Sequence, residues 1–458
     1  MSTTFFTRRK FPPGFRARRG LNWGVVGLMY TSYYLCRYNL PLANKAIADE
    51  FHFSKSDMST IISAQLLAYA IGQIVNGLLT DRIGGKRAML IGAAGTVTMN
   101  LLFGASSFWG FLWLFVVLRS IDGYVQAFGA PGFIKINASW FGQTERGTFA
   151  GIFGFMINLG RLGINYFGAA LLAGFTFLGM WQVPALHWRW LFWIPAGVAS
   201  LVAVVLALVV KDTPEEAGFA GVHAGEADHS DPDIHGEIAT VFKRIVGNPL
   251  VWIIALAYAC TGAVRNSSDQ LAVLYFVEQL KLDVAKSAAA HWTMNLMPLV
   301  AVFGSLASGI ISDKFFKGHR SPVAMGLYFG QSVVIIIAAM IIYSGFVGPT
   351  PAGVFLGCFF LVMISLTVNS THSLVGAAAP MDIGGRRMSG FASGVIDSFQ
   401  YFGAAIALPA TGWLIDRYGW GVWYPTMAGF GVVGGVAMWL VMRKQRRLAT
   451  RLALANRA

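Results

Sequence analysis

The stretch GLLTDRIGGKR at residues 77–87 has a counterpart in GIISDKFFKGHR at residues 309–320. Each copy contains a glycine, three further residues, an aspartate and a basic residue, with more basic residues following. Each copy also follows a long apolar run, and the two copies lie about 230 residues apart. A repeat of this length predicts a chain built of two related halves.

The apolar runs around this repeat predict a membrane protein. Hydrophobic residues make up 55% of the 458 residues, charged residues only 12%, and the mean hydropathy is +0.58. A soluble chain of this size cannot bury so much apolar surface. Because lipid satisfies no backbone polar groups, runs of about 20 apolar residues cross a bilayer as helices. We predict twelve such spans, at residues 22–43, 57–80, 88–107, 109–137, 147–175, 190–210, 250–277, 288–312, 322–346, 351–378, 389–415 and 422–442.

The predicted fold is therefore an all-α membrane protein with twelve transmembrane helices, in two six-helix bundles related by pseudo-twofold symmetry. Residues 211–249 are acidic, carry glycine and proline, and contain few large apolar residues, so we interpret them as a cytoplasmic linker. The linker separates an N-terminal bundle at residues 22–210 from a C-terminal bundle at residues 250–442. Basic cytoplasmic tails are expected at residues 1–21 and 443–458.

The distribution of basic residues predicts the orientation. The formal net charge is +14, and most lysines and arginines lie in the tails and in the loops of one side. The positive-inside rule places that side, with both termini, in the cytoplasm. We expect a multi-pass protein of a bacterial inner (plasma) membrane. The charge then reflects topology, so the expected surroundings are membrane lipid, with no nucleic-acid partner and a monomeric chain.

No motif in the chain predicts an enzyme. There is no glycine-rich phosphate loop with a lysine and no nucleophile elbow. The histidines of the linker and the three cysteines (Cys36, Cys260 and Cys358) lack the spacing of metal ligands. We therefore expect no catalytic residues, no cofactor and no metal site.

Two arginines inside the spans are candidate substrate ligands. Arg37 lies in the first span and Arg265 in its counterpart in the second half, each near the middle of the membrane. A buried charge is costly, so it indicates a functional role. Two guanidinium groups facing one cavity can hold a dianion such as a phosphate, because arginine binds such groups through two nitrogens. The candidate neighbours of the first arginine are Tyr30, Tyr33, Tyr34 and Asn39.

The repeated loops are candidate moving joints. Gly77 and Gly309 permit close approach of helices, and Asp81 and Asp313 can pair with basic groups or helix ends. Such contacts can close one state and release in another. We add to this set the basic residues that follow each aspartate, Arg82 and Lys314.

A further group of buried polar residues is a candidate for proton transfer or for ion pairs. Arg119 and Asp122 stand at i and i+3, which favours a local pair. Asp269 stands four residues after Arg265 and is a candidate resting partner for it. The remaining candidates in spans ten and eleven are His372 and Asp397.

The repeated loop resembles the signature of the major facilitator superfamily. The resemblance implies two six-helix bundles around a central cavity that opens alternately to each side. Within that superfamily, SYYLCRYNL, KDTPEEAG and GFASGVIDSFQYFGAAIALPATGWLIDRYGW resemble the organophosphate:phosphate antiporter family. Its members exchange inorganic phosphate for sugar or glycerol phosphates, and by position the resemblance implies that Arg37 and Arg265 bind the phosphate. DGYVQAFGAPG, residues 122–132, also resembles the family pattern and includes Gln126.

The chain departs from that family at three places. Tyr38 follows the first arginine where the family often has lysine, and Gln270 stands where the family commonly has aspartate. In span five, Ile157 and Asn158 occupy the region where glycerol-phosphate members have a histidine, and Arg161 follows one turn later. These differences leave the phosphate ester unassigned.

Arg161 has two interpretations at this stage. It can serve a more highly charged substrate, or it can pair with Asp122 or Asp397.

Three functional hypotheses follow. The leading one is import of a small phosphorylated or phosphonate anion in exchange for inorganic phosphate. The second is proton-coupled symport of organic carboxylates such as sugar acids. The aspartates within the predicted spans support it. The third is a membrane sensor of sugar phosphate with weak transport.

Overall fold

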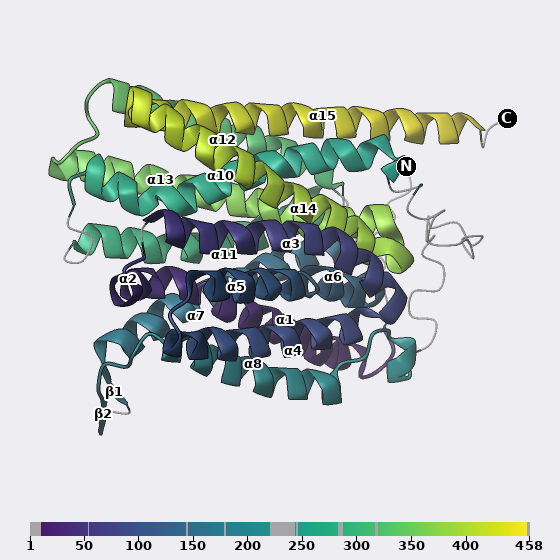
Figure 1. The fold of residues 1–458 in the computed structure, drawn as a ribbon. Coiled ribbons are helices and arrows are strands. Elements are labelled where there is room, and N and C mark those ends of the chain that lie inside the picture. Colours follow the sequence, from purple (N-terminus) through teal and green to yellow (C-terminus); the bar gives the residue numbers. More distant parts are fainter. Residues whose placement is uncertain are drawn as a thin grey trace.

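The computed structural model describes residues 11–53, 55–142, 145–177, 180–219, 243, 246–282, 287–316 and 319–455. The helices of the first half are α1 (Phe15–Arg37), α2 (Asn39–Phe51), α3 (Lys55–Ile83), α4 (Gly85–Ala105), α5 (Leu112–Gln126), α6 (Gly129–Trp140), α7 (Arg146–Ala173) and α8 (Trp190–Val209). Those of the second half are α10 (Pro249–Glu278), α11 (Ala288–Phe315), α12 (Arg320–Tyr343), α13 (Pro351–Ser373), α14 (Ala379–Tyr418) and α15 (Trp423–Ala455). The helices run roughly parallel or antiparallel in one bundle (Figure 1).

The predicted fold class is confirmed. Among the described residues, nine helices are long and apolar enough to cross a membrane: α3, α4, α8 and α10 to α15. Three further spans complete the predicted set: α1 with α2, α5 with α6, and α7. These three carry Arg37, Arg119 and Arg161. Polar groups lower the hydropathy of a span, and they are retained where they line a cavity or a binding site.

Two predicted spans are interrupted in the middle. The first breaks at Tyr38, between α1 and α2, and Pro41 lies in the first turn of α2. Because proline has no N–H, the carbonyl oxygen of Arg37 lacks its usual donor four residues later. The fourth span breaks at residues 127–128, between α5 and α6, with Pro131 just beyond. Interrupted helices expose backbone groups that buried side chains must satisfy.

Elsewhere the boundaries shift. Spans ten and eleven are joined without a loop, because the π-helical turn Leu374–Ala378 links α13 to α14. The last helix continues to Ala455, through most of the range predicted as a basic tail. Of the predicted linker, residues 211–219, 243 and 246–249 are described, and the rest lies outside the described residues.

The two ends of the bundle differ. Helix α1 begins and α15 ends at one end, which we call the terminal end (Figure 1). At the opposite end, strands β1 (Phe175–Phe177) and β2 (Trp181–Val183) form an antiparallel hairpin between α7 and α8. Short 3₁₀ turns complete the chain at Ser106–Phe108, Glu215–Ala217 and Trp420–Val422.

Small residues bring the two halves into close contact. Helix α3 of the first half lies beside α14 of the second (Figure 1). A Cβ atom added at Gly77 would lie 2.7 Å from the carbonyl oxygen of Gly390, and one at Gly394 would overlap that of Gln73. Any side chain there would push the backbones apart. In lipid, association of helices depends on such close packing, so these glycines allow the two halves to meet.

Candidate functional site

Arg37 lies where the two halves face each other. Its Nε donates to Oε1 of Gln126 on α5 at 2.8 Å, and its Nη1 donates to the hydroxyl of Tyr401 on α14 at 3.1 Å. Its guanidinium also lies over the rings of Tyr34 and Tyr69, 4.9 and 4.1 Å from their centroids. Within the described part of the chain, its buried Nη2 has no hydrogen-bond partner.

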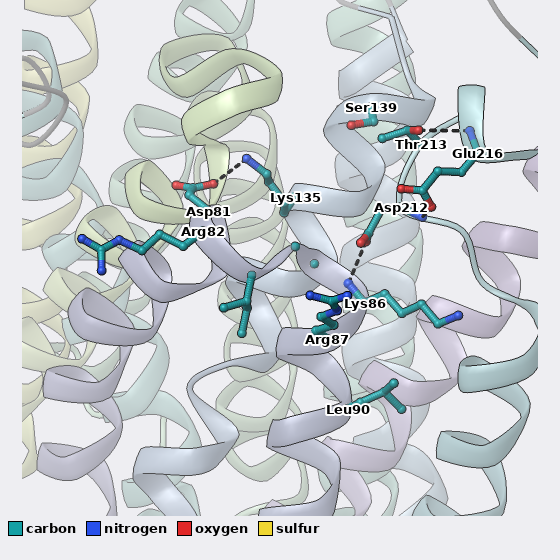
Figure 2. A pocket seen from close by; sticks show the side chains of 13 residues that line it. Asp81, Arg82, Lys86, Arg87, Leu90, Lys135, Ser139, Asp212, Thr213 and Glu216 are labelled. Carbon is teal, nitrogen blue, oxygen red and sulfur yellow. Dashed lines mark hydrogen bonds and ion pairs between the residues drawn. The ribbon is translucent and has the colours of Figure 1, made fainter. Parts of the chain in front are cut away.

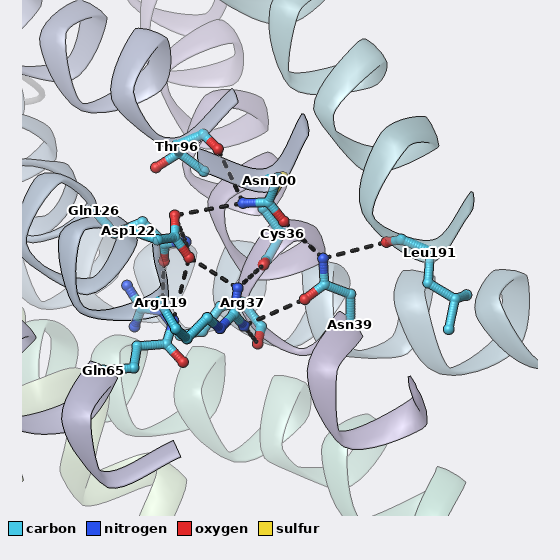
Figure 3. A network of polar contacts seen from close by, with 10 residues as sticks. All are labelled: Cys36, Arg37, Asn39, Gln65, Thr96, Asn100, Arg119, Asp122, Gln126 and Leu191. Carbon is cyan, nitrogen blue, oxygen red and sulfur yellow. Dashed lines mark hydrogen bonds and ion pairs between the residues drawn. The ribbon is translucent and has the colours of Figure 1, made fainter. Parts of the chain in front are cut away.

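Arg119 supports the end of α1, directly before the helix break at Tyr38. Figure 3 shows its contacts with Cys36 and Arg37. Arg119 Nη2 donates to the carbonyl oxygen of Arg37 at 2.8 Å, and Nη1 lies 3.4 Å from that of Cys36. These are carbonyl oxygens at the end of α1, and Pro41 cannot supply a donor for the first of them. Arg119 thus holds the backbone from which the Arg37 side chain extends.

Asp122 joins Arg119 to the neighbours of Arg37 (Figure 3). Its Oδ2 forms a buried ion pair with Arg119 Nη1 at 2.9 Å. Gln126 Nε2 donates to both carboxylate oxygens of Asp122, at 3.0 and 3.1 Å, and Gln126 Oε1 accepts from Arg37. Gln65 and Asn100 each lie 3.4 Å from the same carboxylate. Asp122 therefore pairs locally, as the i, i+3 spacing predicted.

Asn39, predicted as a neighbour of the first arginine, belongs to this network. Its Nδ2 donates to Asn100 Oδ1 at 2.8 Å and to the carbonyl oxygen of Leu191 at 3.2 Å. Its Oδ1 lies 3.3 Å from Arg119 Nη2. Every polar atom of its side chain is thus occupied, so Asn39 supports the helix break.

Arg265 lies in the second half, on α10, and is 3% exposed. Its Nη1 lies 3.4 Å from Nε2 of His372 on α13. The Nδ1 atom of His372 lies 2.6 Å from the hydroxyl of Tyr258. Because an arginine nitrogen can only donate, the neutral histidine accepts from Arg265 at Nε2 and carries its proton on Nδ1. No described group bonds to Arg265 Nε or Nη2.

Asp397 lies between the two halves. Its carboxylate, on α14, is 8% exposed and interacts electrostatically with both Arg37 and Arg265. The candidate substrate ligands and this candidate proton carrier are therefore close together in the fold.

Arg161 pairs with an aspartate that the sequence analysis assigned to another arginine. Its Nη2 forms an ion pair with Oδ2 of Asp269 at 2.9 Å, which joins α7 of the first half to α10 of the second. Neither Asp122 nor Asp397 is its partner, and Asp269 makes its ion pair with Arg161 instead of Arg265. Arg161 Nη1 is buried and makes no hydrogen bond with the described residues.

The remaining predicted neighbours divide into two groups. Tyr34 faces Arg37, whereas the hydroxyl of Tyr33 donates to the carbonyl oxygen of Met89 and points away. Tyr30 is buried and stacks on Phe153, with ring centroids 5.1 Å apart. Asn158 Nδ2 donates to the carbonyl oxygen of Gly154, four residues earlier on α7.

The sequence analysis missed Tyr401 and Tyr69. They come from opposite halves, and their ring centroids lie 4.6 Å apart beside Arg37. Tyr401 follows Asp397 by four residues, so both fall on one face of α14. That spacing is the signal that could have identified Tyr401.

The first repeated loop connects the two halves through Asp81, which Figure 2 shows with its partner Lys135. Asp81 pairs with Lys135 Nζ at 2.8 Å and accepts from the backbone N–H groups of Gly390 and Phe391 on α14, at 3.2 and 2.7 Å. Arg82 is exposed and lines a cavity of about 710 Å³ with Lys86, Arg87, Asp212 and Glu216.

Asp212, beyond the end of α8, closes one side of this cavity (Figure 2). Its Oδ1 accepts from the backbone N–H of Lys86, in the first turn of α4, at 2.7 Å. Burial raises the pKa of the Asp212 carboxyl, and the hydrogen bond from Lys86 opposes that shift. The segment after α8 is therefore attached to the loop that carries the signature.

In the second repeated loop, Gly309 is buried on α11 and Lys314 is exposed. Asp313 Oδ1 lies 3.5 Å from Arg320 Nη1, at the start of α12. Both aspartates thus pair with basic side chains, as predicted.

Buried charges between two helical halves are typical of membrane transport proteins. The comparison with known families agrees with this class. The Major Facilitator Superfamily model matches residues 26–380. The chain belongs to this superfamily, so the resemblance indicated by the repeated loop is confirmed.

Individual relatives refine this assignment. The chain is 27% identical over 401 residues to the glycerol-3-phosphate transporter of Bacillus subtilis (strain 168), an alignment covering 85% of each protein. It is 26% identical over 431 residues to the membrane sensor protein UhpC of Escherichia coli (strain K12), covering 90% of this chain and 88% of that protein. The first of these relatives confirms the resemblance to organophosphate transporters.

Among solved structures, that of FucP, a Major Facilitator Superfamily transporter in the outward conformation, matches with a TM-score of 0.71 at 14% identity. The match covers 93% of this chain and 99% of that one, and it shows the common fold alone.

Proposed function

We propose that this protein is a secondary active transporter of a bacterial inner membrane, which imports a small phosphorylated or phosphonate organic anion in exchange for inorganic phosphate. Arg37 and Arg265 are the proposed phosphate ligands. One observation carries the proposal: buried guanidinium nitrogens on both arginines (Arg37 Nη2, and Arg265 Nε and Nη2) have no hydrogen-bond partner within the described residues.

Buried donors on a cation are costly to leave unpaired. A phosphoryl group supplies several anionic acceptor oxygens, and arginine binds such a group with good geometry and without losing its charge. The remaining nitrogens of both side chains are already held, Arg37 by Gln126 and Tyr401 and Arg265 by His372. The unpaired nitrogens are thus presented by side chains whose orientation is set before the anion arrives, which lowers the entropic cost of binding.

The placement of the two arginines supports alternating access. Arg37 belongs to the first half and Arg265 to the second. An anion that bridges them offsets the repulsion between two cations and favours closure of the halves around it, after which the site opens to the other side. Without an anion the return step is disfavoured, so exchange is favoured over leak. In this mechanism the contact of Asp81 with α14 holds the terminal end closed.

Asp397 favours a second candidate function, proton-coupled symport. Its buried carboxylate interacts with both arginines, so it competes with an incoming anion for the same positive charge. Protonation of Asp397 would relieve that competition and couple anion uptake to a proton.

Exchange in proteoliposomes separates these functions. The purified protein is reconstituted in vesicles loaded with phosphate, and uptake of radiolabelled phosphate is measured with and without an imposed pH gradient. We expect rapid exchange without a gradient, abolished in Arg37→Gln and Arg265→Gln. The matched control is Arg189→Gln, which removes an arginine paired with Glu50 at the end of the bundle opposite the terminal end.

Uptake that requires the pH gradient and is lost in Asp397→Asn would instead establish symport. A third outcome is stabilisation of the detergent-solubilised protein by a phosphate ester without any uptake. It would overturn transport and favour a sensor, as the name of the UhpC relative describes.

A further inference from the structure

Arg161 adds a third cation to the proposed substrate site. It is 8% exposed, and one of its terminal nitrogens, Nη2, is paired with Asp269. The other, Nη1, is buried without a described partner. An internal ion pair explains the first nitrogen but leaves the second unexplained.

A pair of stacked tyrosines connects Arg161 to Arg37. The rings of Tyr34 and Tyr38 stack with centroids 5.7 Å apart and an interplanar angle of 12°. The Arg37 guanidinium lies over Tyr34, and the Arg161 guanidinium lies over Tyr38, 5.2 Å from its centroid. Each ring of the stack therefore contacts one arginine.

Arg265 lies near the same stack. It interacts electrostatically with Tyr34, Tyr38 and Asp269, and Arg161 also lies within its electrostatic range. The Arg37 and Arg161 guanidinium groups therefore lie on one tyrosine stack at the boundary between the halves, and Arg265 interacts electrostatically with both of its rings. Arg161 is adjacent to the proposed phosphate ligands but is not needed to complete the pair that holds the phosphate.

We propose that Arg161 forms a second anion subsite, and that the preferred substrates are organophosphates carrying a carboxylate in addition to the phosphoryl group. This inference rests on the function proposed above and specifies its substrate class. The phosphoryl group lies on Arg37 and Arg265, and the carboxylate accepts from Arg161 Nη1.

The charge of the second group follows from Asp269. A neutral hydroxyl would make a weaker hydrogen bond to a guanidinium than an anion does. A second phosphate dianion would face strong repulsion from the Asp269 carboxylate, which lies 2.9 Å from the same guanidinium. A singly charged carboxylate gains the charge-assisted bond with less repulsion, so it suits this position best.

The test compares two inhibitors of phosphate exchange that differ at one carbon. Glycerol 3-phosphate and 3-phosphoglycerate have the same three-carbon skeleton, but the second carries a carboxylate in place of a terminal alcohol. Because a hydrogen bond between charged groups strengthens binding, we expect 3-phosphoglycerate to inhibit exchange at a half-inhibitory concentration lower by about tenfold or more. In Arg161→Gln, the ratio of the two half-inhibitory concentrations should approach one in the phosphate exchange that remains.

Companion variants distinguish binding from folding. In Asp269→Asn, which removes the competing anion, the preference for 3-phosphoglycerate should increase. The double variant Arg161→Gln/Asp269→Asn replaces the ion pair by two amides of similar size, so it should insert normally and yet lose the preference. Arg189→Gln should keep the wild-type ratio. Equal inhibition by both compounds in the wild type, or an unchanged preference in the double variant, overturns the subsite.

Failure of the proposed function would look different. If the wild type exchanges no phosphate, the increase in melting temperature of the solubilised protein with each of the two compounds measures binding at the subsite directly. Stronger stabilisation by 3-phosphoglycerate that disappears in the double variant supports the subsite, whereas equal stabilisation by both compounds rejects it.

Discussion

Arg119 donates to the backbone carbonyl oxygen of Arg37 at 2.8 Å, where helix α1 ends and Pro41 provides no N–H for that oxygen. A buried arginine in one helix thus replaces the backbone donor that a proline removed from another. The contact links the fold directly to the candidate site, because the side chain of Arg37 extends from the residue whose backbone is held.

We predict that Asp122→Asn destabilises the protein, because it leaves the charged side chain of Arg119 buried without its ion-pair partner. Removing one partner of a buried ion pair typically costs about 3–5 kcal/mol, so the melting temperature of the solubilised protein should fall markedly. In the double variant Arg119→Met/Asp122→Leu no charge is left unpaired, and part of the stability should return. Phosphate exchange should stay low in the double variant, since the Arg37 carbonyl loses its donor. Recovery of full exchange would contradict this positioning role.

Gln126 is predicted to orient the guanidinium of Arg37. In Gln126→Leu, the Arg37 Nε loses its acceptor, and the side chain is less restricted. A hydrogen bond to a charged group contributes about 1.5–3 kcal/mol, so the KM for phosphate in the exchange assay should rise about tenfold or more.

The matched control for this change is Gln331→Leu, since Gln331 is a buried glutamine on α12 whose amide has no partner among the described residues. It should leave the KM unchanged. An equal rise in both variants would mean that loss of a buried amide, and not loss of contact with Arg37, is responsible.

The contact of α3 with α14 is predicted to hold the terminal end closed. Asp81→Asn weakens its ion pair and its bonds to the Gly390 and Phe391 backbone, and Gly77→Leu places a side chain against α14. Both changes should shift the population towards a state open at this end. Spin labels at the exposed positions Arg82 and Lys314, in a cysteine-free background, should report longer distances between the halves in either variant.

A matched control for that measurement is Thr98→Leu. Thr98 is exposed on α4, and its hydroxyl bonds to its own helix, at the carbonyl oxygen of Ala94. Its distance distribution should equal that of the wild type. An unchanged distribution in Asp81→Asn and Gly77→Leu would remove the gating role from the first repeated loop.

The orientation of the chain gives a further prediction. Both termini are expected in the cytoplasm because the loops and tails of that side are rich in lysine and arginine. A C-terminal fusion to green fluorescent protein should fluoresce, and a fusion to alkaline phosphatase should be inactive. A fusion truncated within residues 178–189, between α7 and α8, should give the opposite pair of results. The reverse pattern would invert the topology.

Sequence patterns predicted the architecture well where one physical requirement dominates. Long apolar runs must be helices in lipid, which accounts for α3, α4, α8 and the helices of the second half. The sequence patterns did not locate the break at Tyr38 or the joining of α13 to α14. Apolar content changes little across such points, whereas continuity of the helix depends on hydrogen bonds to side chains such as Arg119.

Partner choice among the buried charges was harder to predict. The i, i+3 pair of Arg119 and Asp122 forms, since both groups lie on one helix and their separation is fixed by its geometry. Asp269 also has an arginine at helical spacing, yet it pairs with Arg161 from the other half. Spacing along one helix says nothing about a charge that another helix brings closer.

From its sequence alone, this protein is determined to be a helical membrane protein in two related halves, with arginines placed inside its first and seventh spans. Those features depend on apolar run length, on the repeated loop and on the cost of a charge in lipid, all of which are local. Only the tertiary structure decided that Tyr401 of one half bonds to Arg37 of the other, that Asp397 interacts electrostatically with Arg37, and that Arg161 shares a tyrosine stack with Arg37. Coulomb and hydrogen-bond energies depend on distance in space, and the packing of α3, α7, α10 and α14 sets those distances.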